Sequence, residues 1–226
     1  MELCANLLEG GTTPSAGTIK VARRCLSIKF HVIIRPRGGD FLYSESELDV
    51  MREDIRVAKD LGADGVVIGC LNADGGIDIE RTRELVELAR PLSVTFHRAF
   101  DMCRDPAAAL EELARLGVDR LLTSGQEASC VEGMDLLAAL NRQAAGRIIV
   151  LPGGGITARN VRKIVAATGV TEVHMSARSS VESGMTYRNA RVFMGGALRP
   201  PEFGWKETDE NAVRLVVQNL REPQGG

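Results

Sequence analysis

Short apolar runs alternate with amphipathic stretches along this chain, and each run plus its following stretch takes about 30 residues. The apolar runs begin near residues 3, 30, 66, 94, 120, 148 and 173. The stretches between them are long enough for a helix that carries the chain from one parallel strand to the next. This spacing predicts an α/β fold with seven strands, and no other feature of the sequence restricts the fold as strongly.

Local signals place the helix starts. Ser44 and Glu47 form a capping-box pattern that opens a helix ending at Leu61. Asp105 and Pro106 stand in the order expected for an N-cap and the first helical residue. The helices predicted in this way span residues 18–26, 44–61, 78–89, 105–116, 133–144, 157–167 and 210–220.

The predicted units fit either a closed barrel or an open doubly wound sheet. An open sheet of the dinucleotide-binding kind would carry a G-x-G-x-x-G pattern after its first strand, where this chain has none. Polar and glycine-rich clusters follow almost every predicted strand, and in a barrel they would converge on one face. We therefore expect a TIM-type (β/α)8 barrel.

Seven strands are one fewer than such a barrel needs. A (β/α)8 barrel takes about 250 residues, whereas this sequence has 226 and begins its first predicted strand directly after Met1. We expect a single domain over residues 1–226 that lacks the first strand and first helix of the barrel.

Composition and charge argue against several classes of protein. The formal net charge is −2 and no basic stripe with interleaved aromatic residues is present, so we expect no nucleic acid as a partner. No run of 18 apolar residues occurs, so we expect no membrane span. The five cysteines are scattered without a CxxC pair and no secretory leader pattern is visible, which indicates a reducing cytosol.

Three polar residues, His97, Arg98 and Asp101, follow the predicted strand 94–97. Histidine can act as an acid or base near neutral pH, arginine forks onto a carboxylate or phosphate, and the aspartate can orient either of them. In a barrel, residues at this end of a strand belong to the face that carries active sites. A purely structural network at the barrel top is the alternative.

Two further segments have the composition of anion sites. Arg35 and Arg37 flank Pro36 ahead of two glycines, as in a rim that clamps an anion, although two salt-bridged surface arginines would look the same. The glycines at 153–155 follow the second-last predicted strand, where barrels often hold a phosphate on backbone N–H groups; a tight turn is the alternative. The candidate ligand-binding residues are Arg35, Arg37, Ser124, Gly153, Gly154, Gly155, Asn160 and Ser176.

The first predicted strand carries polar residues at alternate positions. Glu2, Cys4 and Asn6 therefore share one of its faces. Glu2, together with His174 after the last predicted strand, joins the candidate catalytic residues. Soft thiolates bind Cu(I) or zinc, but no close group of further metal ligands accompanies Cys4 in the sequence.

The motifs, taken together, resemble the CutC copper homeostasis protein family over essentially the whole chain. They are Glu2-Leu3-Cys4, Glu9-Gly10-Gly11-Thr12-Thr13-Pro14-Ser15, Arg35-Pro36-Arg37-Gly38-Gly39-Asp40-Phe41-Leu42-Tyr43, Phe96-His97-Arg98-Ala99-Phe100-Asp101, Leu122-Thr123-Ser124-Gly125, Pro152-Gly153-Gly154-Gly155-Ile156, His174-x-Ser176-Ala177-Arg178 and Ser183-Gly184-Met185 with Arg188-Asn189.

The resemblance implies a TIM-type barrel, a homo-oligomer, and a cytoplasmic location with the nucleus as a second one. It also implies a role in intracellular copper handling, with Cu(I) held by cysteines. Cys4, in the Glu-Leu-Cys motif, is then the metal-binding candidate, whereas a second family cysteine stands in a segment without counterpart in this sequence.

Two hypotheses of different class follow. In the first, the protein is a Cu(I) binder without enzymatic activity that uses Cys4. In the second, it is an enzyme of unassigned reaction whose polar mouth receives a small anionic or phosphorylated molecule. The residues of that mouth are Glu2, Arg35, Arg37, His97, Arg98, Asp101 and His174.

Overall fold

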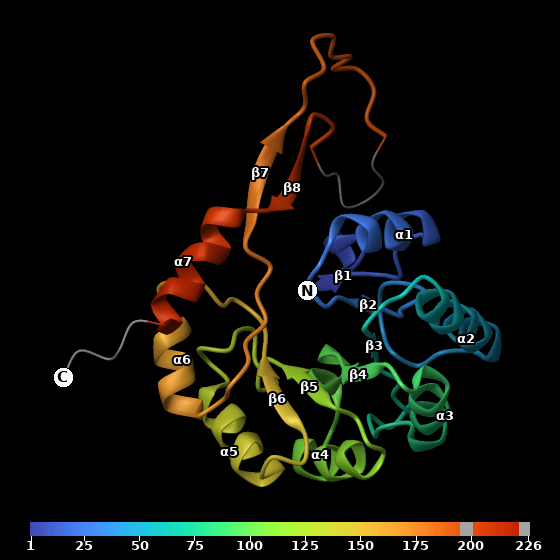
Figure 1. Ribbon diagram of the computed structural model, residues 1–226, viewed down its shortest axis with the longest axis vertical. Helices are drawn as coiled ribbons and strands as arrows, with labels where there is room; N and C mark the ends of the chain where they lie inside the picture. The colour runs from blue at the N-terminus through green and yellow to red at the C-terminus, as the bar shows by residue number, and fades with distance from the viewer. Residues whose placement is uncertain (195–200, 222–226) are drawn as a thin grey trace.

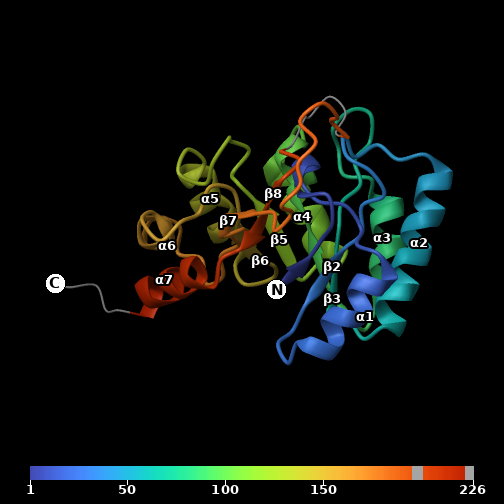
Figure 2. The same ribbon diagram turned by 90° about the horizontal axis from the view of Figure 1, so that it is seen from above.

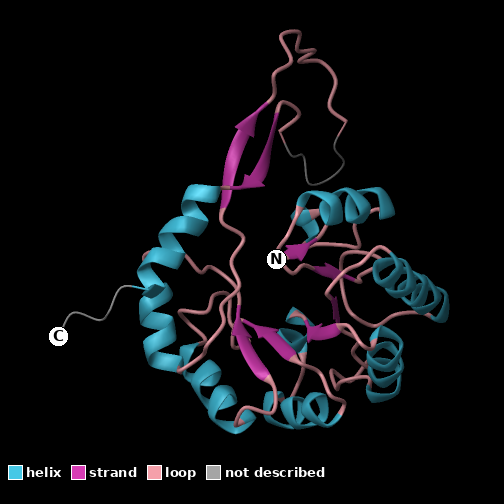
Figure 3. Cartoon of the chain, in the orientation of Figure 1, coloured by secondary structure: helices cyan, strands magenta, loops and turns pink. Residues whose placement is uncertain are grey.

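Six short parallel strands form a curled sheet in the computed structural model, which describes residues 1–194 and 201–221. Their order in the sheet is their order in the chain. The strands line the inside of an arc, and the helices cover its outside (Figures 1 and 3). The strands are β1 (Glu2–Leu3), β2 (His31–Ile33), β3 (Gly65–Ile68), β4 (Ser93–Phe96), β5 (Arg120–Thr123) and β6 (Ile149–Pro152).

The helices between these strands begin where their caps place them. The Ser44 side chain accepts from the backbone N–H of Glu47, whose carboxylate accepts from the backbone of Ser44, which completes the predicted capping box. Asp105 caps the helix that starts at Pro106. The helices are α1 (Ala16–Cys25), α2 (Glu45–Asp60), α3 (Ile79–Ala89), α4 (Pro106–Arg115), α5 (Met134–Ala144) and α6 (Val161–Thr168).

One face of the sheet packs against the helices. Val32 pairs with Val66, Val66 pairs with Val94, and all three side chains are fully buried in the core. The helices present a matching apolar stripe, for example Met51 and Ile55 of α2, which solvent does not reach. Sheet and helices therefore share a two-layer core of the kind that parallel βα units form.

The other face of the sheet lines the concave interior. Ile33, Val67 and Thr95 occupy register-paired positions on three neighbouring strands, and each is buried. Because side chains alternate between faces, the residue two positions after each of these points the same way, at the carboxyl end of its strand. Arg35 and His97 stand at those positions, so the fold itself brings both to the interior mouth.

The prediction of an α/β fold related to the (β/α)8 barrel is confirmed by the parallel order and the outer helices. The prediction of a seventh strand at 173–175 is wrong. His174 forms only an isolated bridge with Gly153 in the described residues, because this apolar run is too short to extend the sheet. The first strand is also shorter than predicted, since Asn6 takes a left-handed conformation (φ 47°) that ends it.

A long hairpin projects from the arc where the sequence predicts only a polar stretch, 179–191. Strands β7 (Arg178–Glu182) and β8 (Gly204–Thr208) pair antiparallel and stand clear of the curled sheet (Figure 1). Helix α7 (Glu210–Arg221) then returns to lie beside α6, as the view from above also shows (Figure 2). Val216 anchors α7 in the core, and the Asn219 side chain donates to the Ala158 carbonyl at 2.6 Å.

None of the helices in the described residues has the length and apolarity needed to cross a membrane. The single domain over 1–226 stays a prediction.

Candidate functional site

Asp101 is the centre of a hydrogen-bonded cluster at the ends of β4 and β5. Its carboxylate accepts from the Arg98 Nε at 2.6 Å, from the Ser124 backbone at 3.1 Å and hydroxyl at 3.0 Å, and from the Gln126 backbone at 3.2 Å. The Thr123 hydroxyl donates to it as well. A carboxylate with this many donors anchors the loop after β5.

Arg98 lies between this cluster and the glycine-rich loop after β6. Its Nη2 donates to the Ser124 hydroxyl at 2.9 Å, while 45% of its side chain remains exposed. A Cβ atom on Gly154 would come within 3.2 Å of the Ser124 Cβ and 3.7 Å of the Arg98 Cζ. Gly154 also has φ +132°, a conformation that suits glycine, so this residue lets the loop approach the guanidinium.

The glycine loop keeps part of its backbone available. Gly153 donates to the Thr123 carbonyl at 2.9 Å, whereas the N–H groups of Gly155 and Ile156 have no acceptor among the described residues. The Asn160 amide donates to the Gly155 carbonyl at 2.8 Å, and thus holds the loop in place. Free backbone N–H groups beside an arginine can receive an anionic oxygen.

Arg35 and Arg37 have different surroundings and do not form a joint clamp. Arg35 is buried and donates to the carbonyls of Glu9, Gly11 and Gly39. Arg37 is half exposed and pairs with acidic side chains at its own loop and at the start of α2, where its Nε lies 2.5 Å from Glu47 Oε1. Arg37 therefore fastens the loop after β2.

His97 is buried beneath that loop. Its Nδ1 accepts from the Ala99 backbone at 3.1 Å, and its ring centroid lies 5.1 Å from that of Phe41. Burial, helped by the nearby Arg35 charge, lowers the pKa of His97 to about 3, so the imidazole is neutral at physiological pH. The ring lies directly over Gly69, where an added Cβ would come 2.3 Å from its Cε1.

Glu2 and His174 meet across the opening of the curled sheet, with Glu2 Oε2 and His174 Nδ1 4.0 Å apart. Burial raises the pKa of Glu2, and the nearby His174 opposes this rise. Burial and the Glu2 charge also raise the pKa of the Cys4 thiol, which lies two residues along the same strand face. Ser176 is exposed, and its carbonyl accepts from Thr208 of the hairpin at 3.4 Å.

The described residues contain no group of three or more histidine, cysteine and acidic side chains that could hold a metal ion. Cys70, Cys103 and Cys130 are buried and Cys25 is exposed at the end of α1. Cys4 is thus the one cysteine of the described residues that is partly exposed on the interior face. Within a single chain, it would supply one thiolate for Cu(I).

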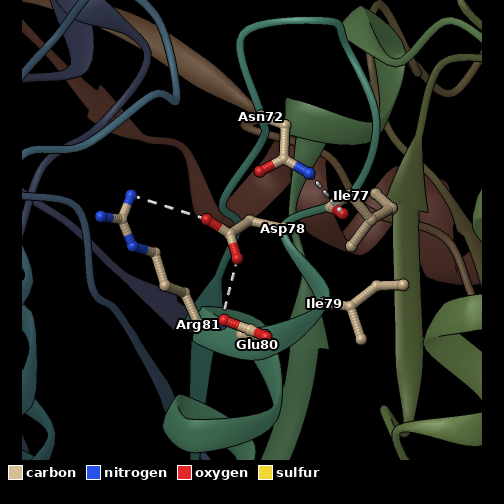
Figure 4. A pocket seen from close by; sticks show the side chains of 6 residues that line it. All are labelled: Asn72, Ile77, Asp78, Ile79, Glu80 and Arg81. Carbon is tan, nitrogen blue, oxygen red and sulfur yellow. Dashed lines mark hydrogen bonds and ion pairs between the residues drawn. The ribbon is translucent and has the colours of Figure 1, made fainter.

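Two cavities border this end of the molecule. One, of about 460 Å³, has walls in which Asp78 and Arg81 pair at 3.5 Å and the Asn72 amide donates to the Ile77 carbonyl at 3.2 Å (Figure 4). Several of its polar groups thus bind one another, and none of the predicted site residues lines it. The other, of about 360 Å³, lies between α1 and α2 and reaches Arg35.

Sequence reasoning thus named Arg35, His97 and Arg98 but missed the residues around them. Phe41 and Gly69 shape the seat of the His97 ring, and Gln126 completes the bonds of Asp101. A glycine directly after an apolar strand was a usable signal for a close approach by a neighbouring side chain.

The fold and the site together define an open (β/α) barrel with polar groups at the carboxyl ends of its strands. The family profile described as CutC family matches residues 1–179. Relatives named copper homeostasis protein cutC homolog, from Mus musculus and Homo sapiens, are 56% and 54% identical over 216 residues, which is 96% of this chain and 79% of each relative. The chain belongs to the CutC family.

Solved structures agree with this assignment. A crystal structure of the CutC protein from Streptococcus agalactiae is 40% identical, has a TM-score of 0.75, and is covered over 86% of its length by 77% of this chain. An aldolase named QR15 has a TM-score of 0.58 at 18% identity, with 71% of this chain and 74% of that chain covered. At that identity the likeness concerns the fold alone.

Proposed function

We propose that this CutC-family protein binds a small anionic or phosphorylated molecule at the carboxyl ends of β4, β5 and β6. The observation that carries the proposal is the position of Arg98, which Asp101 and Ser124 hold against Gly154 while nearly half of its side chain faces solvent. A guanidinium fixed in this way is preorganised for an anion and loses little conformational freedom when it binds one.

The adjacent backbone adds to the same preference. The unused N–H groups of Gly155 and Ile156 follow directly after Gly154, so donors and positive charge occur together. This is the pattern by which barrels bind phosphate at the loops after their last strands. If a reaction takes place in the interior, Glu2 beside His174 is an acid–base candidate, since burial raises the pKa of its carboxyl group.

Calorimetric titration with inorganic phosphate tests the proposal. We expect saturable binding to the wild type and at least about tenfold weaker binding to Arg98→Ala, since a charged hydrogen bond contributes about 1.5–3 kcal/mol. Arg104→Ala is the matched control, because Arg104 leaves the same loop but pairs with Asp74 and is 64% exposed. Equal phosphate affinity in the wild type and Arg98→Ala contradicts the proposal.

Cu(I) is a second candidate ligand, in line with the copper homeostasis named for the mammalian relatives. Cys4 is the proposed ligand, because its thiol faces the interior and is partly accessible. Cu(I) binding would have to displace the proton of the Cys4 thiol, whose pKa is raised, so the affinity of the protein for Cu(I) should increase with pH. A second soft ligand for Cu(I) would come from another chain of a homo-oligomer. We place this copper handling in the cytoplasm and the nucleus.

Competition with a chromogenic Cu(I) chelator tests this second candidate. Cys4→Ser should lose the affinity that the wild type shows, whereas Cys25→Ser, which removes an exposed thiol on α1, should keep it. The same affinity in the wild type and Cys4→Ser eliminates Cys4 as a ligand.

A further inference from the structure

Buried polar atoms without partners gather beneath the loop after β2. Four buried side-chain nitrogen or oxygen atoms in the described residues lack a hydrogen-bond partner, and three of these are Arg35 Nε, Tyr43 Oη and His97 Nε2. The fourth, Thr82 Oγ1, lies alone on α3. Each such atom destabilises the fold unless something binds it, so three in one place require an explanation.

These three side chains are neighbours. The Phe41 ring centroid lies 5.1 Å from the Arg35 Cζ and 5.1 Å from the His97 ring centroid. The Arg35 charge acts on both His97 and Tyr43, and it opposes the burial that raises the pKa of the Tyr43 hydroxyl to about 12. The side chains are between 3% and 6% exposed.

All three atoms carry a hydrogen to donate. Nδ1 of His97 accepts from the Ala99 backbone, so the neutral ring has its proton on Nε2. Arginine Nε is always a donor, and the Tyr43 hydroxyl stays protonated at neutral pH. The Tyr43 hydroxyl can also accept, and Arg35 is near enough to donate to it, but His97 Nε2 and the Tyr43 hydrogen still need an acceptor.

The positive charge of Arg35 also indicates that the cluster binds an acceptor. Arg35 is buried, yet its guanidinium donates to backbone carbonyls and lies over the Phe41 ring, and no carboxylate of the described residues lies within 4.0 Å of it. Buried charges in proteins are normally paired with an opposite charge. The missing component of this cluster is therefore an anionic oxygen.

We propose that Arg35, Tyr43 and His97 form a binding site for a small carboxylate. The two oxygens of a carboxylate would accept from these donors and neutralise the Arg35 charge. The site is separate from the phosphate site at Arg98, since it belongs to the ends of β2, β3 and β4. Of its three side chains, Arg35 also borders the cavity of about 360 Å³ between α1 and α2.

The loop after β2 covers the site as one unit. Arg37 donates to the carbonyls of Gly38, Asp40 and Leu42, which ties the loop to itself. The Phe41 carbonyl accepts from the Leu71 backbone at 2.9 Å, which fixes the loop over the end of β3. A carboxylate would thus bind under a preformed cover.

Histidine-ring NMR with sodium acetate as the probe, against sodium chloride at equal ionic strength, tests the proposal. The chain has three histidines, so the Nε2–H signal of His97 can be assigned by substitution. We expect this signal to shift saturably with acetate. Tyr43→Phe keeps the ring and removes one donor, and it should weaken acetate binding about tenfold. Thr82→Val, which removes the isolated unpaired hydroxyl on α3, should leave binding unchanged.

Several outcomes overturn the proposal. No acetate-dependent shift of the wild-type His97 signal means that ordered water alone occupies the cluster, and this measurement requires no variant to fold. Equal acetate affinity in the wild type and Tyr43→Phe also contradicts it. Arg98→Ala should bind acetate normally, so a failure of the phosphate site and a failure of this site give different results.

Discussion

Replacing Asp101 with asparagine should both destabilise the protein and release Arg98. The carboxylate is only 8% exposed and accepts at both oxygens. One oxygen receives Arg98 Nε and the Ser124 hydroxyl, and the other receives Thr123 and the Gln126 backbone. Whichever way an amide is turned, its NH2 group faces at least two donors.

The size of the effect follows from these contacts. Two opposed donors at about 1 kcal/mol each give about 2 kcal/mol. The lost ion pair adds no more than about 1 kcal/mol, because Arg98 is 45% exposed and screened by solvent. We therefore expect Asp101→Asn to lose about 3 kcal/mol of unfolding free energy, measured by urea denaturation with circular dichroism.

Asp105→Asn is the matched control for this measurement. Asp105 caps α4 by accepting from the Ala108 backbone at 3.0 Å, and it is exposed. Asparagine caps a helix about as well as aspartate, so this variant should stay within about 0.5 kcal/mol of the wild type. An Asp101→Asn variant with the same unfolding free energy as the wild type would refute the assignment of Asp101 as the residue that anchors the loop after β5.

Three further predictions follow from single contacts. Gly69→Ala should lower the stability by about 1–3 kcal/mol in thermal denaturation, because the methyl group would overlap the His97 ring. Since the folded-state pKa of His97 is about 3 and the unfolded value about 6.5, the unfolded chain binds more protons between these pH values, and stability falls as the pH drops through this window. The wild type should therefore lose up to about 2 kcal/mol more than His97→Gln between pH 7 and pH 5; equal losses contradict the buried neutral ring. Ser44→Ala should lower the melting temperature through a loss of about 1 kcal/mol at the α2 cap, and an unchanged melting temperature would contradict the role of this cap.

The sequence predicted the six strands of the curled sheet, most of which are largely buried, and missed the two strands of the exposed hairpin. Strand β3, for example, is an apolar β-branched run, and such runs have few alternatives to a covered parallel sheet. Strand β7 alternates exposed and half-buried residues, most of them polar, and in the described residues it pairs only with β8, so no apolar pattern marked it. The segment at His174 looked apolar enough for a strand but forms one bridge.

The candidate site divides in a similar way. Position in the chain was enough to place Arg35 and His97 at the same mouth, because both follow a strand in the same phase. The sequence could not show that Arg35 is buried whereas Arg37 holds its loop in place. The first depends on a contact of Arg35 with the Glu9 carbonyl, and the second on the ion pair between Arg37 and Glu47. The same holds for Tyr43, whose burial against Arg35 no local pattern predicts.

The most direct test of the proposed anion site at the mouth is a crystal structure of the protein grown or soaked with phosphate. The account predicts a phosphate within hydrogen-bond distance of the Arg98 guanidinium and of the backbone N–H groups of Gly155 and Ile156, and its absence in Arg98→Ala crystals treated in the same way. A phosphate bound only elsewhere on the protein, with Arg98 and the glycine loop contacting water alone, would contradict it.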